Sequence, residues 1–134
     1  MSRTSIAVVL AVAALYSADG TAGTPRYADI VLSDAKDGKA VSTFTPSTPK
    51  IFIRASVADV PDGKKVKAEW IAVKTAVAPP NYKIDATEMV VFKNMTRVDY
   101  SMTRPNKGWP EGDYRVDMYI DGKKATQVTF KVAK

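Results

Sequence analysis

Apolar and polar residues alternate with a period of two through most of the chain beyond about residue 25. The alternating segments are short, and clusters of Gly, Pro, Asn and Asp separate them. This pattern is typical of antiparallel β-strands joined by turns, because successive side chains of a strand point to opposite faces. The sequence predicts seven or eight strands, at residues 28–33, 41–45, 50–57, 66–74, 84–92, 96–103, 113–120 and 124–132.

The same alternation predicts which side chains point into a core. Four strands present a mainly apolar row on one face: Ile51, Ile53, Ala55 and Val57; Val66, Ala68, Trp70 and Ala72; Tyr114, Val116, Met118 and Ile120; and Thr126, Val128, Phe130 and Val132. The opposite faces are more polar, and no segment shows a convincing apolar stripe with helical spacing. We therefore expect an all-β domain in which two antiparallel sheets enclose a single core.

Three features of this pattern resemble immunoglobulin-like β-sandwiches of exported bacterial proteins. Trp70 lies in the strand after the second hairpin, Tyr114 follows a Gly-Asp step at the start of the penultimate strand, and a final hairpin closes the chain. In that family a tyrosine at this corner hydrogen-bonds back to the preceding loop, and the core tryptophan packs on a disulfide. In this chain Val116, two residues after Tyr114, occupies the position of the cysteine that forms this disulfide. The resemblance implies an immunoglobulin-like antiparallel β-sandwich of seven to eight strands, and it says little about function.

The N-terminal residues have a different composition. A basic start that includes Arg3 is followed by an apolar run at residues 6–16 and then by small residues. This order is typical of a secretory signal peptide, and the run is shorter than the ~20 residues that span a bilayer. Small residues at Gly20 and Ala22 favour cleavage after Ala22, which would leave residues 23–134 as one domain. A buried N-terminal helix is the alternative interpretation.

The residue types that are missing restrict the chemistry. The chain contains no histidine and no cysteine, which excludes Ser-His-Asp and Cys-His nucleophiles and also imidazole or thiolate metal sites. A cysteine-free exported domain favours the bacterial periplasm or cell surface over a disulfide-rich secretory route. We expect no catalytic residues, no metal and no cofactor.

Three Asp-Gly pairs, at 37–38, 62–63 and 121–122, resemble a repeated calcium loop. Each lacks the alternating oxygen ligands and the closing glutamate of such a loop. Asp-Gly between alternating strands is instead a strong hairpin signal, so we expect turns at all three positions.

Trp109 is the most prominent candidate for a binding residue. It can stack on a sugar or anchor a protein partner, and the alternative, which we favour, is that it covers the open end of the core beneath Tyr114. Arg104 and Lys107 lie nearby in the sequence, and two cations beside an aromatic suit an anionic glycan.

Three further candidates lie downstream. Tyr119 points outward in its strand, and Lys123 and Lys124 follow the last Asp-Gly turn. The formal net charge of +6 suits an anionic cell-envelope polymer as partner, and the alternative, which we favour, is ordinary charge for solubility. Acidic and basic residues are interleaved, which does not indicate a specific nucleic-acid site.

These observations favour an exported non-catalytic binding module of the periplasm or cell surface, with another protein or an anionic envelope polymer as partner. Binding would use loops or an exposed strand edge, for which the first two strands are candidates. One alternative is an inhibitor of a secreted hydrolase that inserts the loop at residues 108–112 into a cleft. Another is a carboxylate-dependent enzyme, which would need two acidic side chains converging in a pocket. No transmembrane segment is expected after signal cleavage, and the oligomeric state stays open.

Overall fold

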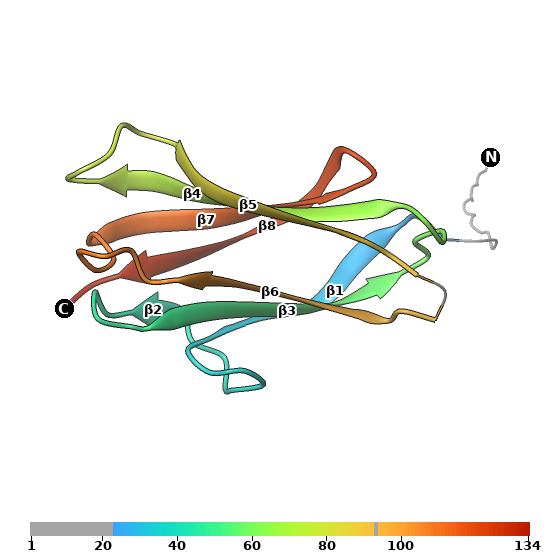
Figure 1. Ribbon diagram of the computed structural model, residues 1–134, viewed down its shortest axis with the longest axis horizontal. Helices are drawn as coiled ribbons and strands as arrows, with labels where there is room; N and C mark the ends of the chain where they lie inside the picture. The colour runs from blue at the N-terminus through green and yellow to red at the C-terminus, as the bar shows by residue number, and fades with distance from the viewer. Residues whose placement is uncertain (1–22, 93) are drawn as a thin grey trace, which may run out of the picture.

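The computed structural model describes residues 23–92 and 94–134, and the predicted signal peptide lies outside them. These residues form two β-sheets packed face to face (Figure 1). The eight strands are β1 (Arg26–Ser33), β2 (Thr43–Phe44), β3 (Lys50–Ala58), β4 (Lys65–Thr75), β5 (Tyr82–Val90), β6 (Arg97–Thr103), β7 (Gly112–Ile120) and β8 (Lys123–Val132). One sheet has the order β1-β3-β6 and the other β2-β8-β7-β4-β5. All neighbouring strands are antiparallel except β2 and β8, which are parallel. The predicted all-β sandwich is confirmed.

The second strand is shorter than the sequence predicts. Only Thr43 and Phe44 pair with β8, whereas the alternation predicts a strand over residues 41–45. The amide of Val41 instead donates to the carbonyl of Leu32 in the other sheet. The chain therefore crosses from one sheet to the other within this segment, and that crossing limits the strand to two residues.

The core consists of the apolar rows predicted from the alternation. Every member of the rows on β3, β4 and β7 is buried, and on β8 the two residues nearest the C-terminus, Phe130 and Val132, are buried as well. Trp70 pairs in register with Val116 at the centre of the five-stranded sheet. The alternation predicts a more polar outer face on β4, but Ile71 of that face is buried and lies in register with Arg115 of β7.

A hydrogen bond between the sheets ties β1 to β7. The hydroxyl of Tyr27 donates to the carbonyl of Tyr119 at 2.7 Å, next to a register shift between Met118 and Tyr119. The Tyr27 and Tyr100 hydroxyls lie 3.3 Å apart, and burial raises the pKa of both phenols. A buried polar group costs stability unless it is paired, so this contact favours one relative placement of the two sheets.

The two ends of the sandwich carry different connections. The turns at residues 59–64 and 121–122 lie together at one end, which we call the hairpin end, and the Asp121 amide donates to the Lys65 carbonyl there. The connections at residues 45–49, 76–81 and 104–111 meet at the opposite end, which we call the loop end (Figure 1). Nine strand residues of β7 separate the two ends by about 30 Å.

The two termini of the folded part follow the same division. β1 begins at the hairpin end, where Arg26 lies beside Lys123. β8 finishes at the loop end, where Val132 pairs with Gly112. The chain therefore enters the fold at one end and leaves it at the other (Figure 1).

Candidate functional site

Trp109 closes the core at the loop end. Its side chain is 1% exposed, and its indole Nε1 donates to the Thr48 carbonyl at 2.9 Å. Its backbone amide donates to the Pro46 carbonyl, also at 2.9 Å, after Gly108 with a φ of 88° turns the chain inward. The interpretation that Trp109 covers the open end therefore fits the geometry. The indole does not project as an exposed platform for a sugar or a partner.

Tyr114 holds the loop that carries Trp109. The Tyr114 hydroxyl donates to the Pro110 carbonyl, which is the corner contact that the resemblance implies. The Tyr114 ring stacks on Phe130 with a centroid distance of 5.0 Å and an interplanar angle of 7°, and Trp109 meets Tyr114 edge to face at 6.0 Å. Burial raises the pKa of Tyr114 to about 12. The aromatic cluster gives the loop end a rigid floor.

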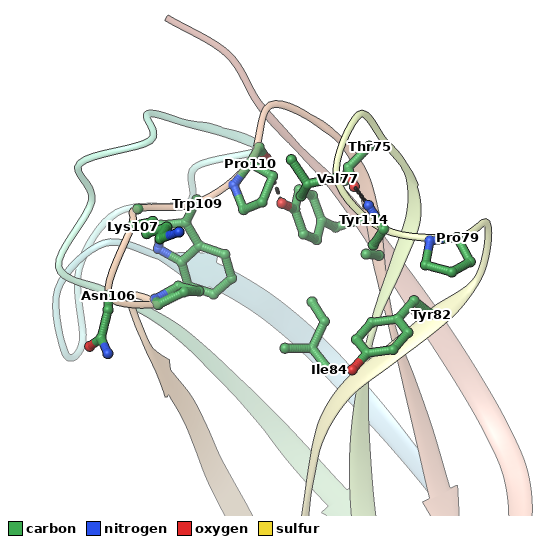
Figure 2. A pocket seen from close by; sticks show the side chains of 14 residues that line it. Thr75, Val77, Pro79, Tyr82, Ile84, Asn106, Lys107, Trp109, Pro110 and Tyr114 are labelled. Carbon is green, nitrogen blue, oxygen red and sulfur yellow. Dashed lines mark hydrogen bonds between the residues drawn. The ribbon is translucent and has the colours of Figure 1, made fainter.

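An apolar groove lies above this floor (Figure 2). Its volume is about 640 Å³, which is in the usual range for small-molecule sites. One wall comes from the connection at residues 76–81 and the start of β5, and carries Val77, Pro79, Tyr82 and Ile84. The facing wall comes from the connection at residues 104–111 and carries Pro105 and Pro110, with Trp109 at the base. We call this hollow the loop-end groove.

The groove leaves large apolar side chains in contact with water. Val77 is 74% exposed and Tyr82 is 52% exposed. They are two of the three strongly exposed large hydrophobic residues in the described part of the chain, and both belong to one wall. Burying such a wall against a ligand is favourable, because apolar area leaves water.

The wall at residues 76–81 is held by specific hydrogen bonds. The Ala78 amide donates to the Thr75 hydroxyl at 3.2 Å, and the Asn81 amide donates to the Val73 carbonyl at 3.1 Å. Asn81 has a φ of 57°, and its side-chain oxygen accepts from Arg115 at 2.7 Å. These contacts fix the position of the wall relative to β4 and β7.

Two cations border the groove on one side. Lys107 lines both the groove and an adjoining hollow that contains Arg104, and the Arg104 guanidinium donates to the Ser47 carbonyl at 2.9 Å. Neither cation forms an ion pair with a carboxylate of residues 23–92 or 94–134. Among the residues that the structure describes, no acidic one lines either hollow. The rim is therefore electropositive and favours an anionic group.

The structure does not bring the other three candidates to this end. Tyr119 and Lys124 are register partners close to the hairpin end, and Lys123 pairs with Ile120 beside them. The Lys124 Nζ lies 3.1 Å from the Asp117 carboxylate, which is 4% exposed. The six candidate residues thus form two groups at opposite ends of β7.

Tyr119 is engaged by its neighbours on the outer face of the sheet. The Lys67 Nζ lies 4.7 Å from the centroid of the Tyr119 ring. Burial and the hydrogen bond to Glu69 both raise the pKa of Tyr119. Burial acts to raise the pKa of Glu69, but hydrogen bonds from Lys67 and Tyr119 outweigh it and leave that pKa lowered. This cluster is internally satisfied and offers no unpaired group to a partner.

The lysines at the hairpin end are interleaved with acids. Lys64 lies 3.5 Å from Asp121, and Arg26 lies 2.6 Å from Asp59. Lys123, the first residue of β8, is exposed beside the 121–122 turn. The connection between the sheets at residues 59–64 and the β7–β8 hairpin lie at the same end, but the surface there has mixed charge and is not a continuous basic patch.

The acidic residues give no convergent pair in the hollows of the surface. The loop-end groove, the adjoining hollow and three further surface hollows of residues 23–92 and 94–134 are each lined by at most one carboxylate. The parts of the chain that the structure describes also contain no cluster of three or more potential metal ligands. All three Asp-Gly pairs contribute to turns, as predicted, and Asp121 and Gly122 both have positive φ values, of 52° and 79°.

Within residues 23–92 and 94–134, no helix has the length and hydropathy needed to cross a membrane.

Sequence reasoning missed one wall of the groove. Val77 and Pro79 belong to a segment that the two prolines mark only as a break between strands, and Tyr82 and Ile84 follow it at the start of β5. The available signal was the apolar run Ala76-Val77-Ala78 within a connection, where polar residues are usual.

Comparisons with known proteins give a likeness at the level of fold. No protein-family model matches the chain, and no curated protein matches it significantly. An immunoglobulin-like protein from Pseudomonas aeruginosa is similar in structure, with a TM-score of 0.58 and 12% identity, over 85% of this chain and 100% of that one.

Two larger proteins contain a similar region. An alkylpurine DNA glycosylase from Pseudomonas fluorescens matches with a TM-score of 0.51 and 10% identity, over 82% of this chain and 30% of that chain. A β-glucosidase from Listeria innocua matches with a TM-score of 0.52 and 10% identity, over 82% of this chain and 16% of that chain. This chain therefore spans less than a third of either protein, and the likeness concerns the fold alone. Together with the observed topology, these matches show that the chain has an immunoglobulin-like β-sandwich fold.

Proposed function

We propose that the chain is an exported, non-catalytic binding module of the bacterial periplasm or cell surface, and that the loop-end groove is its binding site. One observation carries the proposal: an apolar groove with an exposed wall, Val77 and Tyr82, adjoins two cations that form no ion pair within residues 23–92 and 94–134. An apolar hollow with a few placed polar groups is the usual form of a ligand site. The immunoglobulin-like fold is consistent with a binding role, since its loops project from a rigid frame.

The non-catalytic part of the proposal rests on residue chemistry. The chain has no histidine or cysteine to activate a nucleophile. The groove itself is lined by no carboxylate, so general acid–base catalysis by Asp or Glu has no group there. Export is inferred from the composition of residues 1–22.

The other predicted binding modes have less support. An inhibitor would need the loop at residues 108–112 to project, but Trp109 is buried and bonded to the 45–49 connection. Strand addition at β1 or β2 would need a regular free edge. β2 has only two residues, and the pairing of β1 is interrupted at Asp29, whose φ is 52°.

A photocrosslinking residue at position 77, with a matched control at the exposed Ala125 of the hairpin end, tests the proposal in producing cells. We expect a discrete adduct, identified by mass spectrometry, from position 77 and none from position 125. Equal labelling at both positions, or none at position 77, would remove the groove as the binding site.

A further inference from the structure

The loop-end groove offers few hydrogen-bonding groups along its length. Pro79, Pro105 and Pro110 all line it, and proline has no backbone N–H to donate. The Pro110 carbonyl is already occupied by the Tyr114 hydroxyl. The walls therefore present carbon surface where a polar ligand would require donors and acceptors.

The polar side chains of the lining are partly committed. The Thr75 hydroxyl accepts from the Ala78 amide at 3.2 Å, and the Tyr114 hydroxyl donates to the loop. The polar side chains left at the groove are Tyr82 and, on the electropositive rim, Asn106 and Lys107. Side-chain hydrogen-bonding capacity is thus concentrated at the edge of the groove.

This distribution discriminates between classes of ligand. Each residue of a bound peptide brings an N–H and a C=O, and each sugar ring brings several hydroxyls. A polar group that is buried without a partner costs free energy, and this groove cannot pair many of them. An alkyl chain brings none and gains from leaving water.

The rim selects the head of such a ligand. Lys107 lies where the groove meets the hollow of Arg104, so an apolar body in the groove places its end near two cations without carboxylate partners among the described residues. A carboxylate fits the planar guanidinium fork of arginine. Resting on the proposed function, we infer that the loop-end groove binds the alkyl chain of a long-chain fatty acid, whose carboxylate lies against Lys107 and Arg104.

The experiment is a calorimetric titration of the purified protein with palmitate below its micelle concentration, at a pH where the acid is ionised. Tryptophan fluorescence reports in parallel, because Trp109 lines the groove and Trp70 does not. We expect saturable binding of one palmitate per chain. The uncharged primary amide of the same chain should bind at least about tenfold more weakly, as expected for loss of a charged hydrogen-bond partner.

Matched variants localise the binding. Lys107→Glu should weaken palmitate binding about fivefold or more, whereas Lys123→Glu makes the same charge change at the hairpin end and should leave it unchanged. Val77→Asp places a charge on the exposed wall and should weaken it about tenfold or more. Because Val77 is 74% exposed, this variant should fold, which far-UV circular dichroism checks.

Three results would overturn the inference. The first is the absence of saturable palmitate binding, and the second is an equal loss of binding in Lys107→Glu and Lys123→Glu. The third is binding to phosphatidylglycerol vesicles but not to palmitate, with the vesicle binding unchanged in Val77→Asp. A specific crosslink from position 77 to a protein, together with no palmitate binding, would sustain the proposed function and refute the fatty-acid ligand. Loss of both signals would refute both.

Discussion

The hairpin end and the loop end terminate the same strands in contrasting ways. At the hairpin end, Asp121 and Gly122 both adopt positive φ and reverse the chain between β7 and β8 within two residues, and ion pairs such as Lys64–Asp121 cover the surface. At the loop end, longer connections leave the core open, and a buried tryptophan, Trp109, closes it. The two-residue turn between β7 and β8 has no surplus chain from which to build a site. At the loop end an apolar side chain, Trp109, must cover the core, and the loop that carries it also forms one wall of the loop-end groove.

The sharpest test of this contrast is removal of the Trp109 side chain. Trp109→Ala should lower the free energy of unfolding by about 3–5 kcal/mol, because it leaves a cavity among aromatic side chains and deletes the hydrogen bond to Thr48. Urea denaturation followed by circular dichroism measures this. A loss below about 1 kcal/mol would mean that the loop end is not closed as described.

Two glycines with similar backbone conformations compare the ends directly. Gly108 and Gly122 have φ values of 88° and 79°. A Cβ at Gly122 meets no atom within 4 Å, so Gly122→Ala should cost only the left-handed backbone strain, about 1–2 kcal/mol. A Cβ at Gly108 would lie 3.0 Å from the Pro46 carbonyl oxygen, so Gly108→Ala should cost about 1–2 kcal/mol more. Equal losses in thermal unfolding would contradict the tighter packing at the loop end.

Tyr114→Phe removes only the corner hydrogen bond to Pro110 and should cost about 1 kcal/mol at neutral pH. Burial raises the pKa of Tyr114 from its ordinary value of 10.0 to about 12. Because the folded-state pKa is raised, the stabilisation that the protonated Tyr114 hydroxyl contributes is complete below pH 10 and is lost as the pH rises toward 12. Stability measured from pH 9 to 12 should therefore fall less steeply in Tyr114→Phe than in the parent protein. Parallel slopes in the two proteins would exclude this ionisation as a contributor.

The smallest effect should be at the hairpin end. Lys123 is exposed, so Lys123→Ala should change the free energy of unfolding by less than about 0.5 kcal/mol. A loss comparable to that of Trp109→Ala, measured by the same urea titration, would show that the hairpin end also stabilises the core through this turn.

The sequence predicts the fold well because the relevant signals are local. Alternation identifies the inward rows, Asp-Gly marks the turns, and Gly-Asp-Tyr marks the corner at Tyr114, all within a few residues. The short β2 was not predictable, because its length depends on where the chain crosses between the sheets. The burial of Ile71 likewise was not predictable, because it lies on β4 between two neighbouring strands, in register with Lys83 of β5 and Arg115 of β7.

The candidate site was only partly predictable for the same reason. Trp109, Arg104 and Lys107 stand out because they are close in the sequence and have distinctive chemistry. The facing wall, with Val77 and Tyr82, comes from a segment about thirty residues earlier, and only the antiparallel pairing of β4 with β7 brings it opposite them. Tyr119, Lys123 and Lys124 are separated from the groove by the length of β7, which a list of residues does not reveal.

The placement of the two termini has a practical consequence for tethering the protein. Arg26 enters the fold at the hairpin end, so an attachment on the N-terminal side of this residue leaves the groove directed away from the anchoring surface. The last strand residue, Val132, lies beside Gly112 at the loop end, so a fusion or an affinity handle after Lys134 would crowd the groove's approach. Immobilisation from the two ends should therefore give different ligand accessibility for the same folded domain.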